Sequence, residues 1–296
     1  MSFFLFPGQG SQKPGMGKDF YEASNVAREI FDEAAGLLPA GFLETLFSGK
    51  AEAINHTRTA QPALLIVEVA IARHCIAGGL FATGCAGHSL GEIPALVVAG
   101  ALDFAAALKL TLERARLMSE NVPEGGMAAV LGLDAEAIER ALPEGVQVAN
   151  YNGPAQTIIS GRKDALAAAE VSLKDAGAKR VLPLPVSGPF HSRFMRPAAE
   201  SFRKILDAVE FQTPQLVFVS SVTGAPVSDP ELIRGLLADQ LFSPVRWTQV
   251  MQHVPGPAAY EIGPGNVLKG LAKRIDGAPE VVSIGTMEEL STLVRT

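Results

Sequence analysis

The sequence predicts an α/β fold in which a parallel sheet forms the main core and a small unit of different strand order is inserted. Three observations predict this fold. The chain of 296 residues is 48% hydrophobic and 19% charged, so it can bury a large core. Short apolar segments alternate with helical patterns from the start, which favours parallel strands joined by helices. In the middle of the chain the order changes to β-α-β-β-α-β, which is the ferredoxin-like motif.

Two strands and three helices are predicted in the first part of the chain. They are a strand at residues 2–6, helices at 20–38 and 59–77, a strand at 82–87, and a helix at 103–121. The strands are short runs of apolar or small residues, and the helices have apolar residues at helical spacing. Asp103 stands at the N-cap position of the last helix, where its side chain can accept a hydrogen bond from a free backbone N–H.

The inserted unit accounts for the middle of the chain. Its predicted elements are a strand at 127–131, a helix at 134–142, strands at 146–150 and 156–160, a helix at 163–176, and a strand at 179–183. Segments rich in proline or glycine flank it at 123–126 and 183–185. We therefore expect residues 125–186 to form a small subdomain, and residues 1–124 and 187–296 to form a large one. A ligand is expected in the cleft between the two.

The large subdomain resumes after the insert with the same alternation. We expect a helix from Ser192, a strand at 216–220, a helix at 230–240, a strand at 258–262 and a helix at 266–275. These elements return the chain to the parallel sheet.

Charge and cysteine content exclude several classes of protein. The formal net charge is -6 without any run of Lys or Arg, which argues against a nucleic-acid partner. The charge-free stretches 74–91 and 211–228 are interrupted by glycine, histidine, proline or serine, so neither predicts a membrane span. Cys75 and Cys85 form no disulfide framework and no metal-ligand spacing. The first residues lack the charged start of a signal peptide. We expect a cytoplasmic protein with no membrane or metal partner.

Residues 87–91 read Gly-His-Ser-Leu-Gly, a G-x-S-x-G pentapeptide between a strand and a helix. Glycines at these positions allow a sharp turn that exposes the serine hydroxyl. The N–H groups that follow lie at a helix N-terminus, where negative charge is favoured. Ser89 is therefore a candidate nucleophile. The alternative is a glycine-rich turn in which the serine only caps the helix.

A serine nucleophile needs a base, and the chain contains five histidines. His191 lies in a loop immediately before a predicted helix, from which it can reach a cleft. His74 lies in an apolar helical segment, and His88 precedes the serine on a turn where neighbouring side chains point apart. His56 and His253 are isolated in polar surroundings. The candidate base is His191, with an ordinary loop histidine as the alternative.

The loop at residues 8–12, Gly-Gln-Gly-Ser-Gln, follows the first predicted strand. It does not match the dinucleotide fingerprint, because Lys13 occupies the third glycine position. It does not match the P-loop either, because Met16 follows Gly15. Loops at the carboxyl ends of parallel strands are nevertheless well placed for a site. The backbone N–H groups of this loop can complete an oxyanion hole with the N–H of Leu90.

Arg114 lies at the edge of the buried stripe of the predicted helix at 103–121, whereas Arg116 faces the other way. A charge near the core needs a partner. Two partners are possible. One is a carboxylate of the protein, in a structural ion pair, and the other is a carboxylate of the substrate, bound through two hydrogen bonds.

Several blocks together resemble the malonyl-CoA:acyl carrier protein transacylase family, which includes the acyltransferase domains of polyketide synthases. They lie, in order, at residues 6–12, 59–63, 87–92, 114–118, 149–154, 188–191 and 261–265. The resemblance implies an α/β-hydrolase-like core with an inserted ferredoxin-like subdomain. It also implies transfer of a malonyl group from malonyl-CoA to the phosphopantetheine thiol of an acyl carrier protein, through an acyl-serine intermediate.

The resemblance assigns roles in catalysis to residues at the matching positions. Ser89 would carry the acyl group, and His191 would act first as base and then as acid. The backbone carbonyl of Gln240 would orient the histidine, since the family has no acidic third member. The backbone N–H groups of Gln9 and Leu90 would form the oxyanion hole.

Other residues match the family's contacts with its substrate. Arg114 would bind the free carboxylate of malonyl, and Asn152 would also bind the substrate. Lys179 and Arg180 would lie near the phosphates of coenzyme A, with a solvated strand end as the alternative. The resemblance implies no permanently bound cofactor and no metal; coenzyme A is the product.

A stripe of arginines is a candidate docking surface for the carrier. Arg193, Arg196 and Arg203 fall within about 80° of one another on the helix that begins beside His191, at 100° per residue. Carrier proteins of this pathway are strongly acidic, so we expect the stripe to bind the carrier despite the net charge of -6. The alternative is a solvated helix face. We expect the protein to be a monomer.

Two other functions compete with malonyl transfer. A serine hydrolase or thioesterase of the α/β-hydrolase type shares G-x-S-x-G, but its acid precedes its histidine in the chain. A non-catalytic scaffold of a multienzyme complex would not need Ser89, His191 and Gln240. The sequence does not separate fatty-acid synthesis from polyketide synthesis, nor from the transacylase of a malonate decarboxylase system.

Overall fold

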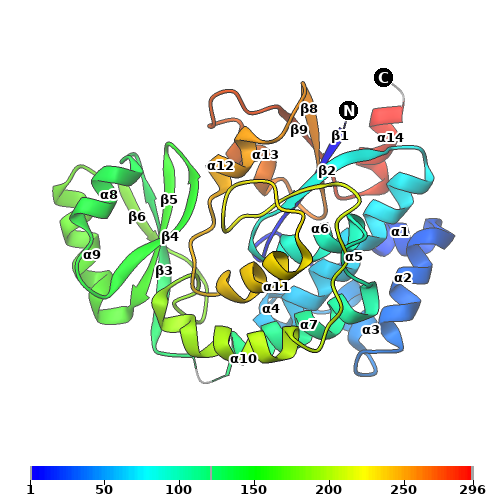
Figure 1. The fold of residues 1–296 in the computed structure, drawn as a ribbon, viewed down its shortest axis with the longest axis horizontal. Helices are drawn as coiled ribbons and strands as arrows, with labels where there is room; N and C mark the ends of the chain where they lie inside the picture. Colours follow the sequence, from blue (N-terminus) through cyan, green and yellow to red (C-terminus); the bar gives the residue numbers. More distant parts are fainter. Residues whose placement is uncertain (1, 121, 295–296) are drawn as a thin grey trace.

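A five-stranded parallel sheet forms the core of the larger part of the molecule, which we call the large subdomain (Figure 1). The structure, a computed structural model, describes residues 2–120 and 122–294. The strand order is β7 (Val217–Val219), β2 (Ala82–Gly87), β1 (Ser2–Phe6), β8 (Ala258–Ile262) and β9 (Glu280–Ile284). Phe6 of β1 lies opposite Gly87 of β2, so the segments that follow these strands leave the sheet side by side. Ligands bind at this carboxyl edge in open α/β sheets.

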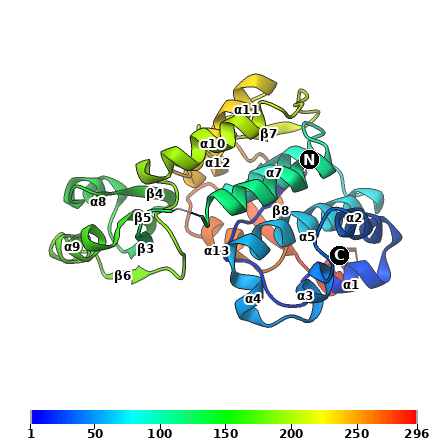
Figure 2. The same cartoon turned by 90° about the horizontal axis from the view of Figure 1, so that it is seen from below.

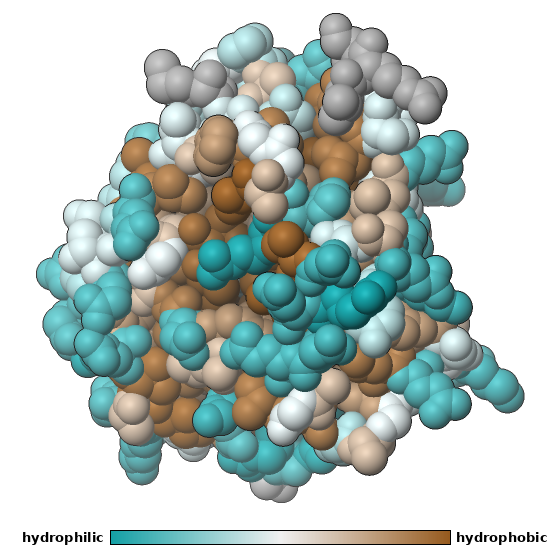
Figure 3. Space-filling model, turned by 90° about the vertical axis from the view of Figure 1, so that its right-hand side faces the viewer, coloured by the Kyte–Doolittle hydropathy of each residue, from teal (hydrophilic) through white to brown (hydrophobic). Residues whose placement is uncertain are grey.

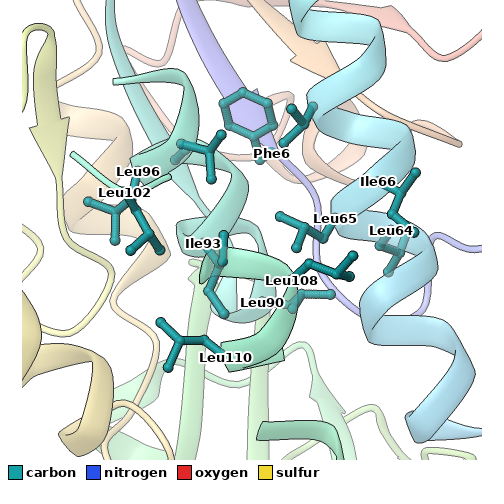
Figure 4. Packing of buried hydrophobic residues seen from close by; sticks show 14 of the residues in the cluster. Phe6, Leu64, Leu65, Ile66, Leu90, Ile93, Leu96, Leu102, Leu108 and Leu110 are labelled. Atoms are coloured by element: carbon teal, nitrogen blue, oxygen red, sulfur yellow. The ribbon is translucent and has the colours of Figure 1, made fainter. Parts of the chain in front are cut away.

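Helices cover both faces of the sheet, and alternate residues of β1 enter two separate buried clusters. Phe4 and Phe6 belong to one cluster, and Phe3 and Leu5 belong to the other. The first cluster includes residues of α2 (Asn25–Ala35), α5 (Thr57–Ala77), α6 (Glu92–Val98), α7 (Phe104–Leu117) and α10 (Arg196–Leu206), and the second includes residues of α12 (Trp247–Gln252) and α13 (Val267–Ala272). Figure 4 shows the first cluster where α5, α6 and α7 meet beneath Phe6. The predicted α/β fold is confirmed.

Helix α5 is the one helix of the described residues that could cross a membrane by length and composition. Its apolar window has a mean hydropathy of 1.4, yet 78% of that window is buried inside the protein. It packs against α2, α6 and α7. Its apolar surface is thus used for packing within the core.

A second, antiparallel sheet is formed between α7 and α10, and we call this part the small subdomain. The strand order is β4 (Val146–Gly153), β5 (Gln156–Arg162), β3 (Gly125–Leu131) and β6 (Arg180–Pro183). Two helices, α8 (Ala135–Ala141) and α9 (Lys163–Asp175), close a separate core with this sheet. The predicted ferredoxin-like order is confirmed. Figures 1 and 2 show this unit set to one side of the large sheet.

The two subdomains are joined by backbone hydrogen bonds as well as by the chain. The N–H of Tyr151 donates to the carbonyl of Val245 at 2.8 Å, and the N–H of Val245 donates to the carbonyl of Ala149 at 2.8 Å. Val245 lies between α11 (Pro230–Asp239) and α12. These bonds fix β4, and with it the small sheet, beside the large subdomain.

Several predicted helix boundaries are wrong. The helix predicted at 20–38 is two helices, α1 (Lys18–Ala23) and α2, because Ser24 is extended and its hydroxyl caps α2 at the N–H of Ala27. The helix predicted at 103–121 begins after its Asp103 cap as expected but ends at Leu117, and Asn121 lies outside the described residues. The helix predicted from Ser192 starts with a 3-10 turn before α10.

Some elements were not predicted at all. They are α3 (Phe42–Ser48), α4 (Ala51–Asn55), α12, β9 and α14 (Met287–Val294), whereas α6 is the helix predicted to follow the serine turn. The helices among them are short, so they carry little periodic signal.

On the face of the molecule that carries α1, α2 and α14, apolar side chains gather between polar ones (Figure 3).

Candidate active site

Ser89 stands on a sharp turn between β2 and α6. Its φ is +53°, in the left-handed region that residues other than glycine rarely adopt. The glycines on either side permit the turn by close backbone contact. A Cβ on Gly87 would lie 1.9 Å from the carbonyl carbon of Gly91, and a Cβ on Gly91 would lie 2.1 Å from the carbonyl oxygen of Phe6. Such strain is typical of a nucleophile held out for reaction.

His191 meets Ser89 across the carboxyl edge of the sheet. Its Nε2 lies 2.8 Å from the Oγ of Ser89. Its Nδ1 lies 2.8 Å from the carbonyl of Gln240 and 3.2 Å from the carbonyl of Ser243. A carbonyl only accepts, so Nδ1 carries the proton and Nε2 is free to accept the serine proton. Like Ser89, His191 has a left-handed φ, of +57°.

The surroundings of His191 keep the ring neutral. The side chain is buried, and burial together with the nearby Arg114 charge lowers the pKa of His191 to about 3. The carbonyls of Gln240 and Ser243 act in the opposite direction but are weaker. A neutral imidazole is the form that a general base requires.

Arg114 reaches the same serine from α7. It is 1% exposed, and its Nη2 lies 3.1 Å from the Oγ of Ser89. Nη2 also donates to the Oε1 of Gln240 at 2.7 Å, and Nη1 donates to the Oε1 of Gln61 at 2.8 Å. Burial lowers the pKa of Arg114 to about 10, against the opposing effect of the Glu92 charge. The guanidinium thus stays charged at neutral pH with amides rather than carboxylates as its direct partners.

The backbone N–H groups of Gln9 and Leu90 lie on the two adjacent loops. Among the backbone and side-chain hydrogen bonds of the described residues, neither of these N–H groups donates to an acceptor. The loops approach closely, since a Cβ on Gly8 would lie 2.5 Å from the carbonyl oxygen of His88. Unused N–H groups beside a serine are suited to hold a developing oxyanion.

A cavity of about 260 Å³ opens above Ser89 between the two subdomains. The large subdomain lines it with Gly8, Gln9, Gly10, Gln61, His88, Ser89, Leu90, Arg114, Met118, Phe190, His191, Val267, Leu268 and Leu271. The small subdomain and its exit strand line it with Met127, Asn150, Asn152, Gln156, Ile158, Leu184 and Val186. The lining is mainly apolar, and Ser89, His191 and Arg114 are among its polar members.

Comparison with known proteins identifies the family. A model of the acyl transferase domain matches residues 3–291. The chain belongs to the acyl transferase family. A malonyl CoA-acyl carrier protein transacylase of Bacillus subtilis is 41% identical over 304 residues, covering 99% of this chain and 96% of the relative.

Solved structures give the same result. An acyl carrier protein S-malonyltransferase of Vibrio cholerae has a TM-score of 0.93 at 42% identity, covering 98% of this chain and 99% of that one. A malonyl-transacylase in complex with its type II PKS acyl-carrier protein has a TM-score of 0.94 at 40% identity, covering 100% and 99%.

The other histidines of this acyl transferase do not reach the serine hydroxyl. His88 turns toward the small subdomain, where its Nε2 lies 2.9 Å from the Oδ1 of Asn152. Asn152 lines the cavity and also holds His88, and its contact with the substrate stays a prediction. His74 lies 2.8 Å from the hydroxyl of Ser24, and His56 and His253 are exposed.

The structure does not bring Lys179 and Arg180 to the cavity. Both are exposed at the start of β6, and neither lines the cavity, whereas Leu184, just past the other end of this strand, does. Their position agrees with the alternative given from the sequence, a strand end exposed to solvent. Any contact with coenzyme A must come from parts of that ligand outside the cavity.

The arginine stripe is only partly as predicted. Arg193, Arg196 and Arg203 are all exposed, but Arg193 belongs to a 3-10 turn rather than to the helix, so its angular position differs from the 100° spacing assumed. Arg203 is paired with Asp239 at 2.6 Å, which offsets its charge. Arg196 lies over the ring of Phe242 at 4.4 Å. Of the three arginines, Arg193 and Arg196 are nearest His191 in the sequence, and neither has a carboxylate partner among the described residues.

Two polar contributors to the site carried no predicted role. Gln61 is buried on the apolar helix α5 and binds Arg114, and Glu92 is buried at the start of α6. A polar residue within an apolar helical stripe was the available signal for Gln61. Within the described residues, no group of three or more His, Cys, Asp or Glu could hold a metal ion.

Proposed function

We propose that this acyl transferase moves a malonyl group from malonyl-CoA to the phosphopantetheine thiol of an acyl carrier protein, through an acyl-serine intermediate. One observation carries the proposal: the Oγ of Ser89 lies within hydrogen-bond reach of both the neutral His191 and the charged Arg114. A single methylene separates the malonyl carboxylate from the acyl carbonyl. A cation that touches the nucleophile is therefore in place to bind that carboxylate.

The first half-reaction acylates the serine. The Oγ of Ser89 attacks the thioester carbonyl while the Nε2 of His191 takes the hydroxyl proton. The oxyanion that forms accepts hydrogen bonds from the backbone N–H groups of Gln9 and Leu90. The carbon–sulfur bond then breaks, and coenzyme A leaves with the proton from His191.

The second half-reaction reverses these steps with another thiol. The phosphopantetheine thiol of the carrier gives its proton to His191, and its sulfur attacks the ester carbonyl. The ester bond to Ser89 breaks, and the serine oxygen recovers the proton. The carbonyl of Gln240 holds the imidazole in one tautomer through both halves.

The arrangement favours transfer over hydrolysis by a serine hydrolase or thioesterase. The Nδ1 partners of His191 are two backbone carbonyls rather than a carboxylate. A buried arginine beside the nucleophile also selects an acyl group that carries a negative charge. A scaffold without catalysis would have no use for these contacts.

The proposal extends to contacts with the rest of the substrates. Asn152 lines the cavity and is placed to bind the pantetheine arm or the acyl group. The exposed Lys179 and Arg180 match the family's basic pair for the outer phosphates of coenzyme A. The exposed Arg193 and Arg196 follow His191 closely in the chain and are placed to meet an acidic carrier.

We place the reaction in fatty-acid or polyketide synthesis in the cytoplasm, with coenzyme A as product and no resident cofactor. Both cysteines are buried free thiols, which suits a reducing compartment. The transacylase of a malonate decarboxylase system is the alternative.

The test is to mix the protein with malonyl-CoA and measure its intact mass. We expect one malonyl adduct on Ser89 that persists in water and disappears on addition of a phosphopantetheinylated carrier. The Ser89→Ala variant should gain no adduct. Steady release of free malonate without a carrier would instead identify a hydrolase.

A further inference from the structure

Glu92 is a buried carboxylate next to the active site that the proposed mechanism does not use. It is 1% exposed and stands in the first turn of α6, three residues after the nucleophile. Its Oε1 accepts a hydrogen bond from the backbone N–H of Ser221, and its Oε2 accepts one from the Nε2 of Gln240. Burying a carboxylate is costly, so a group kept here needs a reason.

The contact with Gln240 determines which way its side-chain amide faces. A carboxylate offers only acceptors, so the amide NH2 must point toward Glu92. The same NH2 donates to the carbonyl of Ser89 at 3.0 Å. The amide oxygen is then left to face α7, where it accepts from the Nη2 of Arg114 at 2.7 Å. Glu92, Gln240 and Arg114 thus form one directional chain of hydrogen bonds.

This series of hydrogen bonds from Glu92 to Arg114 also explains how Arg114 can be buried without a direct ion pair. No carboxylate of the described residues forms a salt bridge with Arg114. Glu92 raises the pKa of the guanidinium, against the larger effect of burial. Burial raises the pKa of Glu92 to about 7, and the hydrogen bonds from Ser221 and Gln240 oppose this shift. When it is ionised, Glu92 places a negative charge one amide away from the guanidinium without occupying its N–H groups. A carboxylate in direct contact would occupy the groups that a substrate needs.

We propose that Glu92 is a positioning residue for acyl-group selection: by fixing the orientation of the Gln240 amide, it holds Arg114 charged and correctly directed toward the malonyl carboxylate. This inference rests on the proposed function, because it takes Arg114 as the group that binds malonyl. It adds a residue outside the cavity to the set that determines specificity.

The test compares acylation of Ser89 by malonyl-CoA and by acetyl-CoA in the Glu92→Gln variant. A glutamine has nearly the same shape but can donate as well as accept, so it no longer fixes the Gln240 amide. We expect the ratio of the malonyl rate to the acetyl rate to fall roughly tenfold or more, the effect of losing one charge-assisted hydrogen bond. The acetyl rate should change less than about threefold.

Two further variants separate the possible outcomes. Glu92→Asp keeps the charge and should retain a higher ratio than Glu92→Gln. If Glu92→Gln gives no cooperative melting curve, Glu92→Asp becomes the test, and a ratio in it as low as in Arg114→Ala overturns the proposal. Arg114→Ala tests the proposed function itself. An altered ratio in Arg114→Ala with an unaltered one in Glu92→Gln refutes only the role of Glu92. If Glu92→Gln lowers the malonyl and acetyl rates equally, Glu92 has only a structural role. An unaltered ratio in Arg114→Ala would show that Arg114 does not bind the malonyl carboxylate.

Discussion

The Nη2 of Arg114 lies 3.1 Å from the Oγ of Ser89, the same oxygen that lies 2.8 Å from the Nε2 of His191. A neutral imidazole and a permanent cation therefore meet at one serine hydroxyl. The cation favours the serine oxygen as it loses its proton, and it discourages protonation of the histidine. In the proposed function it also attracts the malonyl carboxylate to the point where the acyl group is bonded.

Arg114→Ala should abolish this preference for a charged acyl group. Removing one partner of a buried, hydrogen-bonded charge pair costs about 2–5 kcal/mol, so kcat/KM for malonyl-CoA should fall roughly thirtyfold or more. Activity with acetyl-CoA should rise, because the uncharged acyl group no longer meets a buried cation. Both values come from steady-state transfer to a carrier. Equal losses on the two donors would assign Arg114 a structural role.

The pH profile should show no acidic limb from His191. Burial and the Arg114 charge lower its pKa to about 3, so the base stays deprotonated well below its ordinary pKa of 6.5. With p-nitrophenyl acetate, which carries no titrating group, the burst rate should fall less than about twofold between pH 8 and pH 5. A base of ordinary pKa would lose roughly thirtyfold over the same range. A limb centred near 6.5 would contradict the assigned surroundings.

Close backbone contact at the serine turn predicts that Gly87 cannot be replaced by alanine without loss of stability and activity. A Cβ there would lie 1.9 Å from backbone atoms of Gly91, so Gly87→Ala forces the turn apart. We expect the free energy of unfolding to fall by about 3 kcal/mol or more, and serine acylation to be lost. Denaturant unfolding and the malonyl adduct measure the two effects.

Gly270 of α13 provides the matched control. A Cβ at this position meets nothing within 4 Å, so Gly270→Ala should stabilise the protein by about 0.5–1 kcal/mol through helix propensity. If both alanine variants were equally stable, the close contacts would not explain why Gly87 is needed.

The turn that carries Ser89 was predictable from sequence because its geometry is local. Two glycines and a serine within five residues determine the turn, and the strand and helix around it follow from short-range patterns. The break at Ser24 is also local in cause, but Phe20, Ala27 and Phe31 are all buried at near-helical spacing across it. The periodic pattern therefore concealed it, and only the capping serine marked it.

The rest of the site depends on contacts between distant segments. Arg114 binds Gln61 and Gln240, which are 53 and 126 residues away in the chain, and neither spacing can be read from a pattern. From its position on the helix, we could not decide whether Arg114 binds a carboxylate of the protein or one of the substrate. The structure adds a third arrangement, in which amides bind the guanidinium and the carboxylate of Glu92 lies behind one of them. Only the packing of α5, α6, α7 and α11 brings these groups together.

The surface beside His191 gives the last prediction. Arg193 and Arg196 are exposed, with no carboxylate partner among the described residues, whereas Arg203 is paired with Asp239. Reversing both charges, in Arg193→Glu with Arg196→Glu, should raise KM for an acidic carrier several-fold and leave KM for malonyl-CoA unchanged, since rim charges act mainly on association. Arg140→Glu serves as the control, because Arg140 is exposed on α8 of the small subdomain and does not line the cavity. The effect of the double variant should shrink at high salt, where exposed charges are screened. An unchanged carrier KM at low salt would show that the carrier docks elsewhere.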